Sequence, residues 1–88
     1  MKPILLMKLT HCPHCQRALA MMEDLFVEHP EYREIPLKIV DEGEEPAFAE
    51  TLDYYYVPTF YVGDEKVHEG VPTKEAIEKV FQMAVEAS

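Results

Sequence analysis

The sequence predicts a single α/β domain whose elements follow the order β-α-β-α-β-β-α. Three segments support this prediction: the apolar run of residues 3–9 is too short for a helix, residues 13–29 show the apolar spacing of an amphipathic helix, and residues 59–68 resemble a β-hairpin. A β-α-β unit joins parallel strands by a right-handed crossover, whereas a hairpin adds antiparallel strands. We therefore expect residues 1–88 to form one four-stranded mixed sheet with helices on both faces.

The first strand and the first helix meet at a Thr-His-Cys-Pro turn. Residues 3–9 are apolar enough for a strand that is buried on both faces. Pro13 suits the first turn of a helix, where its missing N–H is not needed, and His29-Pro30 ends that helix. The expected apolar face of the helix consists of Cys15, Ala18, Leu19, Met22, Leu25, Phe26 and His29.

The remaining elements follow from shorter patterns. Residues 35–40 are typical of a second strand, and the acidic run 41–45 is expected to be a solvated loop. Pro46 begins a short helix. Residues 59–68 then form a hairpin with a turn at Gly63-Asp64, and Thr73 is the expected N-cap of a terminal helix with a regular apolar face.

Composition and charge exclude several classes of function. The 88 residues carry 17 Asp and Glu against 8 Lys and Arg, a formal net charge of −9, and the basic residues are scattered. Such a chain repels phosphate backbones and anionic lipid headgroups, so we expect neither nucleic-acid binding nor membrane binding. No apolar run approaches the roughly 18 residues of a membrane span, and no leader pattern follows the first apolar run. We expect a cytoplasmic monomer.

The strongest chemical signal is the tetrapeptide Cys12-Pro13-His14-Cys15 at the junction of strand and helix. Cys12 stands at the expected helix start, where unpaired N–H groups and the helix dipole stabilise a thiolate, so it is the expected nucleophile. Cys15 lies on the apolar face of the helix and is the expected resolving thiol. Pro13 and His14 are the residues expected to tune the thiolate, with His14 supplying an imidazolium near the Cys12 sulfur.

A metal-binding module is the alternative function. His11, Cys12, His14 and Cys15 place four soft or borderline ligands for zinc, copper or a bridged iron-sulfur cluster within five residues. Adjacent ligands rarely close on one ion, and structural zinc sites usually combine two separated pairs. His29 and His68 are expected to be a helix-end residue and a strand residue rather than ligands.

The chain resembles the thioredoxin/glutaredoxin superfamily in its minimal, glutaredoxin-sized form. The resemblance rests on Cys12-Pro13-His14-Cys15, on Val57-Pro58-Thr59 before the third strand and on the late Gly70. It implies the strand order 2-1-3-4, a cis peptide bond at Pro58, and a thiol-disulfide oxidoreductase that acts on disulfide-containing proteins or small molecules. For substrate binding it implies Val57 and Pro58, and His11 and Tyr56 are further candidates for substrate binding beside Cys12 and Val57.

The electron donor stays open between glutathione and a thioredoxin-reductase-type flavoprotein, with no cofactor expected to be bound. Glutaredoxins have a lysine where this chain has Leu9, and a Gly-Gly pair near Gly70. Thioredoxins have a buried aspartate where this chain has Leu6. The Pro-His pair between the cysteines resembles that of periplasmic disulfide oxidases.

Three consecutive tyrosines, residues 54–56, precede Val57. In one interpretation two of them pack on the core as the chain enters the third strand. In the other, one tyrosine lines the substrate groove, and Tyr56 is the candidate because it adjoins Val57.

Overall fold

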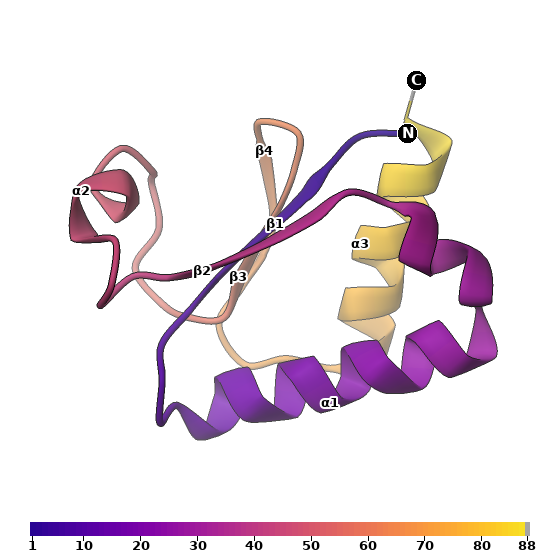
Figure 1. The fold of residues 1–88 in the computed structure, drawn as a ribbon, viewed down its shortest axis with the longest axis horizontal. Coiled ribbons are helices and arrows are strands. Elements are labelled where there is room, and N and C mark those ends of the chain that lie inside the picture. Colours follow the sequence, from indigo (N-terminus) through magenta and orange to yellow (C-terminus); the bar gives the residue numbers. More distant parts are fainter. Residues whose placement is uncertain (88) are drawn as a thin grey trace.

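The computed structural model describes residues 1–87 and contains one four-stranded sheet, three α-helices and one 3₁₀ helix (Figure 1). The strands are β1 (Ile4–Lys8), β2 (Leu37–Asp41), β3 (Thr59–Val62) and β4 (Glu65–Glu69). The helices are α1 (Pro13–Glu28), the 3₁₀ helix η1 (Pro30–Glu34), α2 (Pro46–Ala49) and α3 (Lys74–Glu86).

The strand order is β2-β1-β3-β4, which confirms the predicted mixed sheet. β1 pairs parallel with β2, from Ile4 beside Leu37 to Lys8 beside Asp41. β3 is antiparallel to both β1 and β4. Because β1 and β2 run in the same direction, they finish at the same end of the sheet. From this end the chain continues to Cys12.

The apolar side chains form a cluster on each face of the sheet. The larger cluster lies under α1 and α3. Within it, the ring of Phe81 lies 5.4 Å from that of Phe26 and 5.2 Å from that of Tyr32, measured between centroids. The smaller cluster, Met7, Val40 and Tyr61, is covered by Phe48 and Ala49 of α2 and by the segment that follows it. Helices therefore lie on both faces, as predicted.

Two of the three predicted helix starts have a side-chain capping hydrogen bond. Cys12 is the N-cap of α1, and its Sγ accepts a hydrogen bond from the N–H of Cys15. Thr73 is the N-cap of α3, and its Oγ1 accepts from the N–H of Ala76 at 3.1 Å. α1 ends at Glu28, with His29 as its C-cap. These local signals set the helix positions.

The region between α1 and α2 differs from the prediction. Residues 30–34 form the 3₁₀ helix η1, which the sequence pattern did not predict. As a result, β2 begins at Leu37, two residues later than expected, and extends to Asp41. The expectation that Asp41 belongs to a solvated loop is wrong, because this residue ends the strand and is only 7% exposed. Residues 42–45 do connect β2 to α2.

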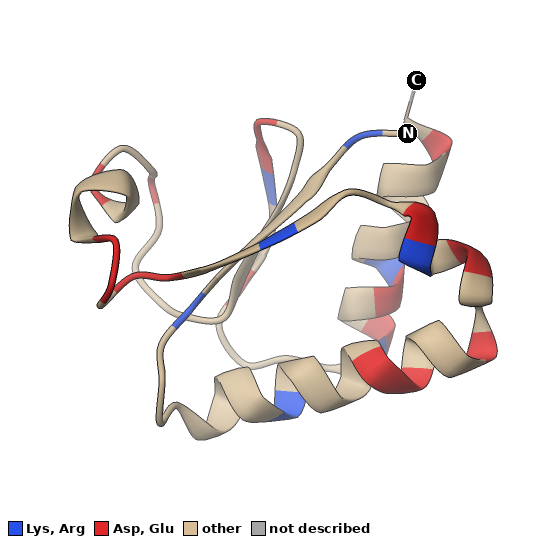
Figure 2. Cartoon of the chain, viewed as in Figure 1, with Lys and Arg blue, Asp and Glu red and all other residues tan. Residues whose placement is uncertain are grey.

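Among the charged residues, Asp and Glu predominate in the second half of α1, in η1 and in the connection before α2. Lysines and arginines are scattered over the chain (Figure 2). Within residues 1–87, no helix is both long and apolar enough to span a bilayer.

Candidate active site

Cys12 and Cys15 have different surroundings although one helical turn joins them. Cys12 is partly exposed at the N-cap of α1, and Cys15 is buried with 1% of its surface exposed; both are free cysteines. The N–H of Cys15 lies 3.1 Å from the Cys12 Sγ and donates to it. A hydrogen bond of this kind stabilises negative charge on the accepting sulfur. The partly exposed sulfur is thus placed for attack, and the buried one lies one helical turn further on.

The buried thiol is poorly acidic. Burial, the largest cause, together with the hydrogen bond and the charge of Cys12, raises the pKa of Cys15 to about 11. The backbone of Leu9 and the charge of Lys8 oppose this shift. At neutral pH Cys15 therefore carries its proton, as expected of a thiol that acts second.

The buried carboxylate of Asp41 holds the segment that leads to Cys12. Its Oδ2 accepts hydrogen bonds from the backbone N–H and the hydroxyl of Thr10, at 3.0 and 2.5 Å, and lies 3.4 Å from the Lys8 Nζ. Its Oδ1 accepts from the N–H of Gly43 at 2.8 Å. These bonds, foremost that of the Thr10 hydroxyl, lower the pKa of Asp41 to about 2. They compensate the burial of the charge.

The two histidines beside the cysteines face different surroundings. His11 is exposed and has a left-handed backbone, with φ of 65°, at the point where the chain turns from β1 into α1. His14 is also exposed, and its Nδ1 accepts a hydrogen bond from Nη2 of Arg17. A guanidinium only donates, so this bond requires an unprotonated Nδ1. The expected imidazolium beside the Cys12 sulfur stays a prediction.

The segment before β3 is connected to β4. The Val57–Pro58 peptide bond is cis, the isomer that the superfamily resemblance implies. The Pro58 carbonyl accepts from the N–H of Gly70 at 2.9 Å, and the Thr59 hydroxyl donates to the carbonyl of Tyr56. Pro58 itself is buried.

A cavity of about 340 Å³ joins this segment to the first turn of α1. Its lining is mainly apolar and consists of His14, Tyr56, Val57, Gly70 and Val71. The structure thus brings together three of the predicted site residues, His14, Tyr56 and Val57. The lining does not include the other predicted site residues, which are His11, Cys12, Pro13, Cys15 and Pro58.

Only one of the three tyrosines packs on the core. Tyr54 is half-buried beside the smaller cluster, and its hydroxyl donates to Glu42 at 3.1 Å. Tyr55 and Tyr56 are 84% and 70% exposed. The interpretation with two packed tyrosines is therefore wrong, because Tyr55 and Tyr56 are exposed on the segment that leads to β3. Tyr56 lines the cavity, as the other interpretation expected.

The potential metal ligands are not gathered around a common point. Across residues 1–87, no group of three or more His, Cys, Asp or Glu side chains is arranged to hold a metal ion. His11, Cys12, His14 and Cys15 thus do not form a ligand cluster. His29 lies at the end of α1 beside Glu31 and Glu78, and His68 lies in β4 with its Nε2 3.0 Å from the Val71 carbonyl oxygen. Both histidines occupy the places predicted for them.

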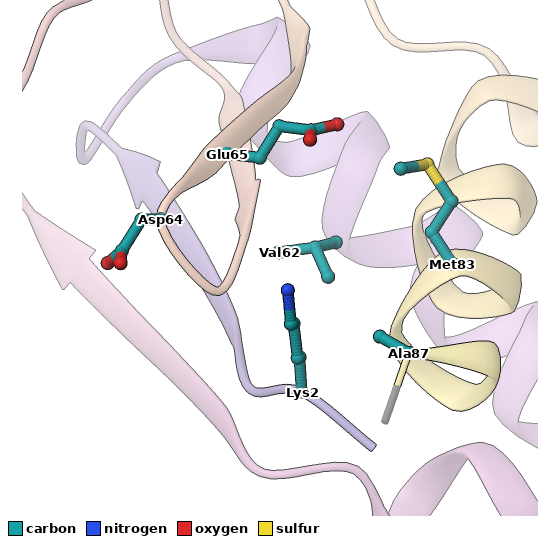
Figure 3. A pocket seen from close by; sticks show the side chains of 6 residues that line it. All are labelled: Lys2, Val62, Asp64, Glu65, Met83 and Ala87. Carbon is teal, nitrogen blue, oxygen red and sulfur yellow. The ribbon is translucent and has the colours of Figure 1, made fainter.

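Another cavity lies at the opposite end of the sheet. It has about 330 Å³ and is lined by Lys2, by Asp64 and Glu65 of the hairpin, and by Met83 of α3 (Figure 3). Figure 3 shows the Lys2 ammonium group pointing into it. Neither cysteine belongs to the lining of this cavity or of the cavity beside α1, but only the latter includes His14, which stands between the two cysteines. The chemistry of the protein is therefore expected beside α1.

The residues that support the site were not predicted from the sequence. Thr10, Asp41 and Glu69 hold the segments around Cys12 and Val57, and Val71 lines the cavity. For Asp41 the available signal was an acidic residue directly after a buried strand that is parallel to β1. Glu69 lies one residue beyond the predicted hairpin, and it comes opposite Thr59 only because the strand register shifts between Phe60 and Tyr61.

The fold and the cysteine pair define a class, that of small α/β proteins with two cysteines at the start of a helix. The chain belongs to the thioredoxin-domain family, because the model of the thioredoxin domain matches residues 3–82. This membership and the two cysteines three residues apart support a redox role in general terms. No sequence among curated proteins matches the chain.

Two solved structures share the fold. The chain is similar to the oxidised thioredoxin from Plasmodium falciparum, with a TM-score of 0.68 and 20% identity over 90% of this chain and 76% of that one. It is also similar to a structure described as a malarial protein, with a TM-score of 0.68 and 14% identity over 93% of this chain and 94% of that one. At these identities the likeness shows the fold alone.

Proposed function

We propose that the protein is a glutaredoxin/thioredoxin-like thiol-disulfide oxidoreductase that cycles between a Cys12/Cys15 dithiol and the corresponding disulfide. The observation that carries this proposal is the unequal burial of the two sulfurs. Cys12 is partly exposed and receives a hydrogen bond at a helix start, whereas Cys15 is buried with a pKa raised to about 11. One sulfur is suited to attack a substrate, and the other to attack the resulting mixed disulfide.

The reaction has two exchanges. In the first, the Cys12 thiolate attacks one sulfur of the substrate, the bond to that sulfur forms, the substrate S–S bond breaks, and the other half leaves as a thiolate that takes up a proton. In the second, Cys15 gives up its proton to water and attacks the Cys12 sulfur, which releases the remaining half. The substrate gains two electrons, and Cys12 and Cys15 become a disulfide.

The substrates are proposed to bind in an extended conformation, with an apolar side chain next to the reactive disulfide in the cavity beside α1. Val57 lines the cavity with Tyr56 and Val71, in the segment where the resemblance implies main-chain recognition. In this proposal the backbone N–H and C=O of Val57 bond to the main chain of a disulfide-containing protein, or to a small peptide disulfide. Pro58 directly follows Val57 in this segment, and His11 directly precedes Cys12 in the chain.

The donor that returns the disulfide to the dithiol is proposed to be glutathione or a thioredoxin-reductase-type flavoprotein. Both are soluble reductants of a reducing compartment, which agrees with the proposed cytoplasmic location. The protein is proposed to act as a monomer. Pro13 and His14 are proposed to tune the Cys12 thiolate. No resident cofactor is needed for either exchange.

Mixed-disulfide trapping tests the assignment. Cys15→Ser should accumulate a covalent adduct with a peptide disulfide, because Cys12 still attacks and nothing resolves the product. Cys12→Ser should form no adduct under the same conditions, because the remaining thiol is buried and protonated. Peptide mapping by mass spectrometry locates the adduct, and its loss on addition of a reductant is the control.

An adduct on Cys15 in the Cys12→Ser variant, at the rate of the other variant, would reverse the two roles. If the wild-type protein exchanges with no disulfide and is purified with stoichiometric metal, the metal-module function replaces the proposal.

A further inference from the structure

The segment that presents Val57 is attached to β4 by one side chain. Glu69 is the last residue of β4 and lies opposite Thr59 of β3. Its Oε2 accepts hydrogen bonds from two consecutive backbone N–H groups, those of Tyr55 and of Tyr56, the latter at 2.9 Å. These two residues directly precede Val57, so the carboxylate fixes the backbone on which the proposed substrate contact depends.

The other oxygen of the carboxylate is held as well. The Lys66 Nζ donates to Oε1 of Glu69 at 2.9 Å and to the carbonyl oxygen of Asp53 at 3.1 Å. The side chain of Glu69 is only 20% exposed. Lys66, and after it the two backbone N–H groups, lower the pKa of Glu69 to about 2, so the carboxylate stays ionised at any pH suited to an exchange assay.

A further hydrogen bond joins the end of β4 to the segment around Val57. The next residue, Gly70, donates its N–H to the carbonyl of Pro58 at 2.9 Å and lines the cavity. With φ of 94°, Gly70 turns the chain away from β4 in a conformation that other residues rarely adopt. Bonds from adjacent residues therefore hold both sides of Val57: Glu69 before it and Gly70 after it.

We propose that Glu69 is a positioning residue that sets the backbone of residues 55–57 for recognition of peptide disulfides, without taking part in the exchange at Cys12. The inference rests on the proposed function. It separates two properties of the protein, since a peptide needs the Val57 backbone in place and a disulfide without amide groups does not. Loss of Glu69 should therefore change substrate preference and leave the intrinsic reactivity of the thiols unchanged.

The test compares two disulfides in single-turnover reactions of the reduced protein. One is a short peptide closed by an internal disulfide, and the other is bis(2-hydroxyethyl) disulfide, which has no amide group. Aliquots are quenched with a thiol-alkylating reagent, and the oxidised fraction is measured by mass spectrometry. In Glu69→Ala the rate constant for the peptide should fall about tenfold relative to that for the small disulfide, the loss expected for charge-assisted hydrogen bonds.

Two further variants serve as comparisons, one conservative change of Glu69 and one control in the same strand. Glu69→Gln keeps an oxygen acceptor for the N–H groups and loses the pairing with Lys66, so the relative rate should fall only about threefold. Glu65→Ala removes an exposed carboxylate from the same strand and should leave it unchanged. Amide hydrogen exchange gives a readout independent of activity: Tyr55 and Tyr56 should exchange faster in Glu69→Ala, while protection of the sheet is kept.

Each outcome decides a different point. If the wild-type protein reacts with neither disulfide, the proposed function fails. If it reacts with both and Glu69→Ala slows both equally, or neither, Glu69 does not position the substrate segment. If Glu69→Ala does not fold, the folded Glu69→Gln variant decides: an unchanged rate ratio together with unchanged exchange at Tyr55 and Tyr56 overturns the inference.

Discussion

His14 stands between the two cysteines, and its ring bonds to Arg17 one turn further along α1. The bond uses a lone pair on Nδ1, which a proton would occupy, and protonation would also place a second positive charge beside the guanidinium. A neutral ring would contribute no charge to the Cys12 thiolate. The tuning role proposed for His14 therefore depends on whether Arg17 holds the ring neutral.

A double-mutant comparison tests this dependence. In the wild-type background His14→Tyr should lower the reduction potential by less than about 10 mV, because a neutral ring is replaced by another neutral ring. In the Arg17→Ala background the ring is free to take up a proton, and the same exchange removes a charge contact of about 0.5–1 kcal/mol, or roughly 10–20 mV. Equilibration against a glutathione buffer at neutral pH measures both shifts. Equal shifts in the two backgrounds would contradict the part assigned to Arg17.

At the level of elements, Asp41 joins the end of β2 to the connection between β1 and α1. The parallel register places it beside Lys8, and its carboxylate reaches the N–H and hydroxyl of Thr10. The position of Cys12 is thus supported from two sides, by the helix that it caps and by the neighbouring strand.

Asp41 should make the stability of the protein depend on pH. Because its pKa is about 2 in the folded protein and about 3.9 when unfolded, the ionised carboxylate stabilises the fold above pH 4, and this contribution is lost as the pH falls toward 2. Asp41→Asn should therefore lower the urea midpoint at pH 7, and the difference from wild type should shrink between pH 4 and pH 2. Circular dichroism measures the midpoints.

The matched control is Asp64→Asn, which changes an exposed aspartate in the turn between β3 and β4. It should leave the midpoint almost unchanged at pH 7. A wild-type advantage over Asp41→Asn that stays constant down to pH 2 would show that the carboxylate charge does not stabilise the fold.

At the scale of the whole molecule, the net charge of −9 acts on every approaching substrate. The radius of gyration is 12.1 Å, whereas the Debye length is about 30 Å at 0.01 M salt and about 3 Å at 1 M. At low salt the site therefore feels the acidic residues of the entire molecule. At high salt only groups close to Cys12 contribute.

The salt dependence of exchange should follow the charge of the substrate. We expect the rate with cystamine, which is cationic, to fall severalfold between 0.01 and 1 M salt, and the rate with anionic dithiodiglycolate to rise. The neutral bis(2-hydroxyethyl) disulfide is the control and should change little. Stopped-flow or quenched-flow measurements on the reduced protein give the three slopes. The opposite order would mean that Lys8 and Arg17, close to the cysteines, outweigh the remaining charge.

The order of the elements, the strand order of the sheet and the two helix caps at Cys12 and Thr73 were predictable from the sequence and its resemblance to a known superfamily. The element order and the caps depend on residues close together in the chain: a period of apolar residues, a proline in a first turn, a side chain that bonds to an N–H three residues on. The cysteine pair is recognisable for the same reason. Its place at a helix start needs only those local patterns.

The supports of the site were decided by the tertiary structure. Asp41 and Thr10 are 31 residues apart and meet only because β1 and β2 are in register, while Glu69 reaches Tyr56 only because β4 folds back along β3. The burial of Asp41 and the exposure of Tyr55 depend likewise on which surface each residue meets. A polar side chain finds its partner through space, so its role is determined by packing that a linear pattern does not contain.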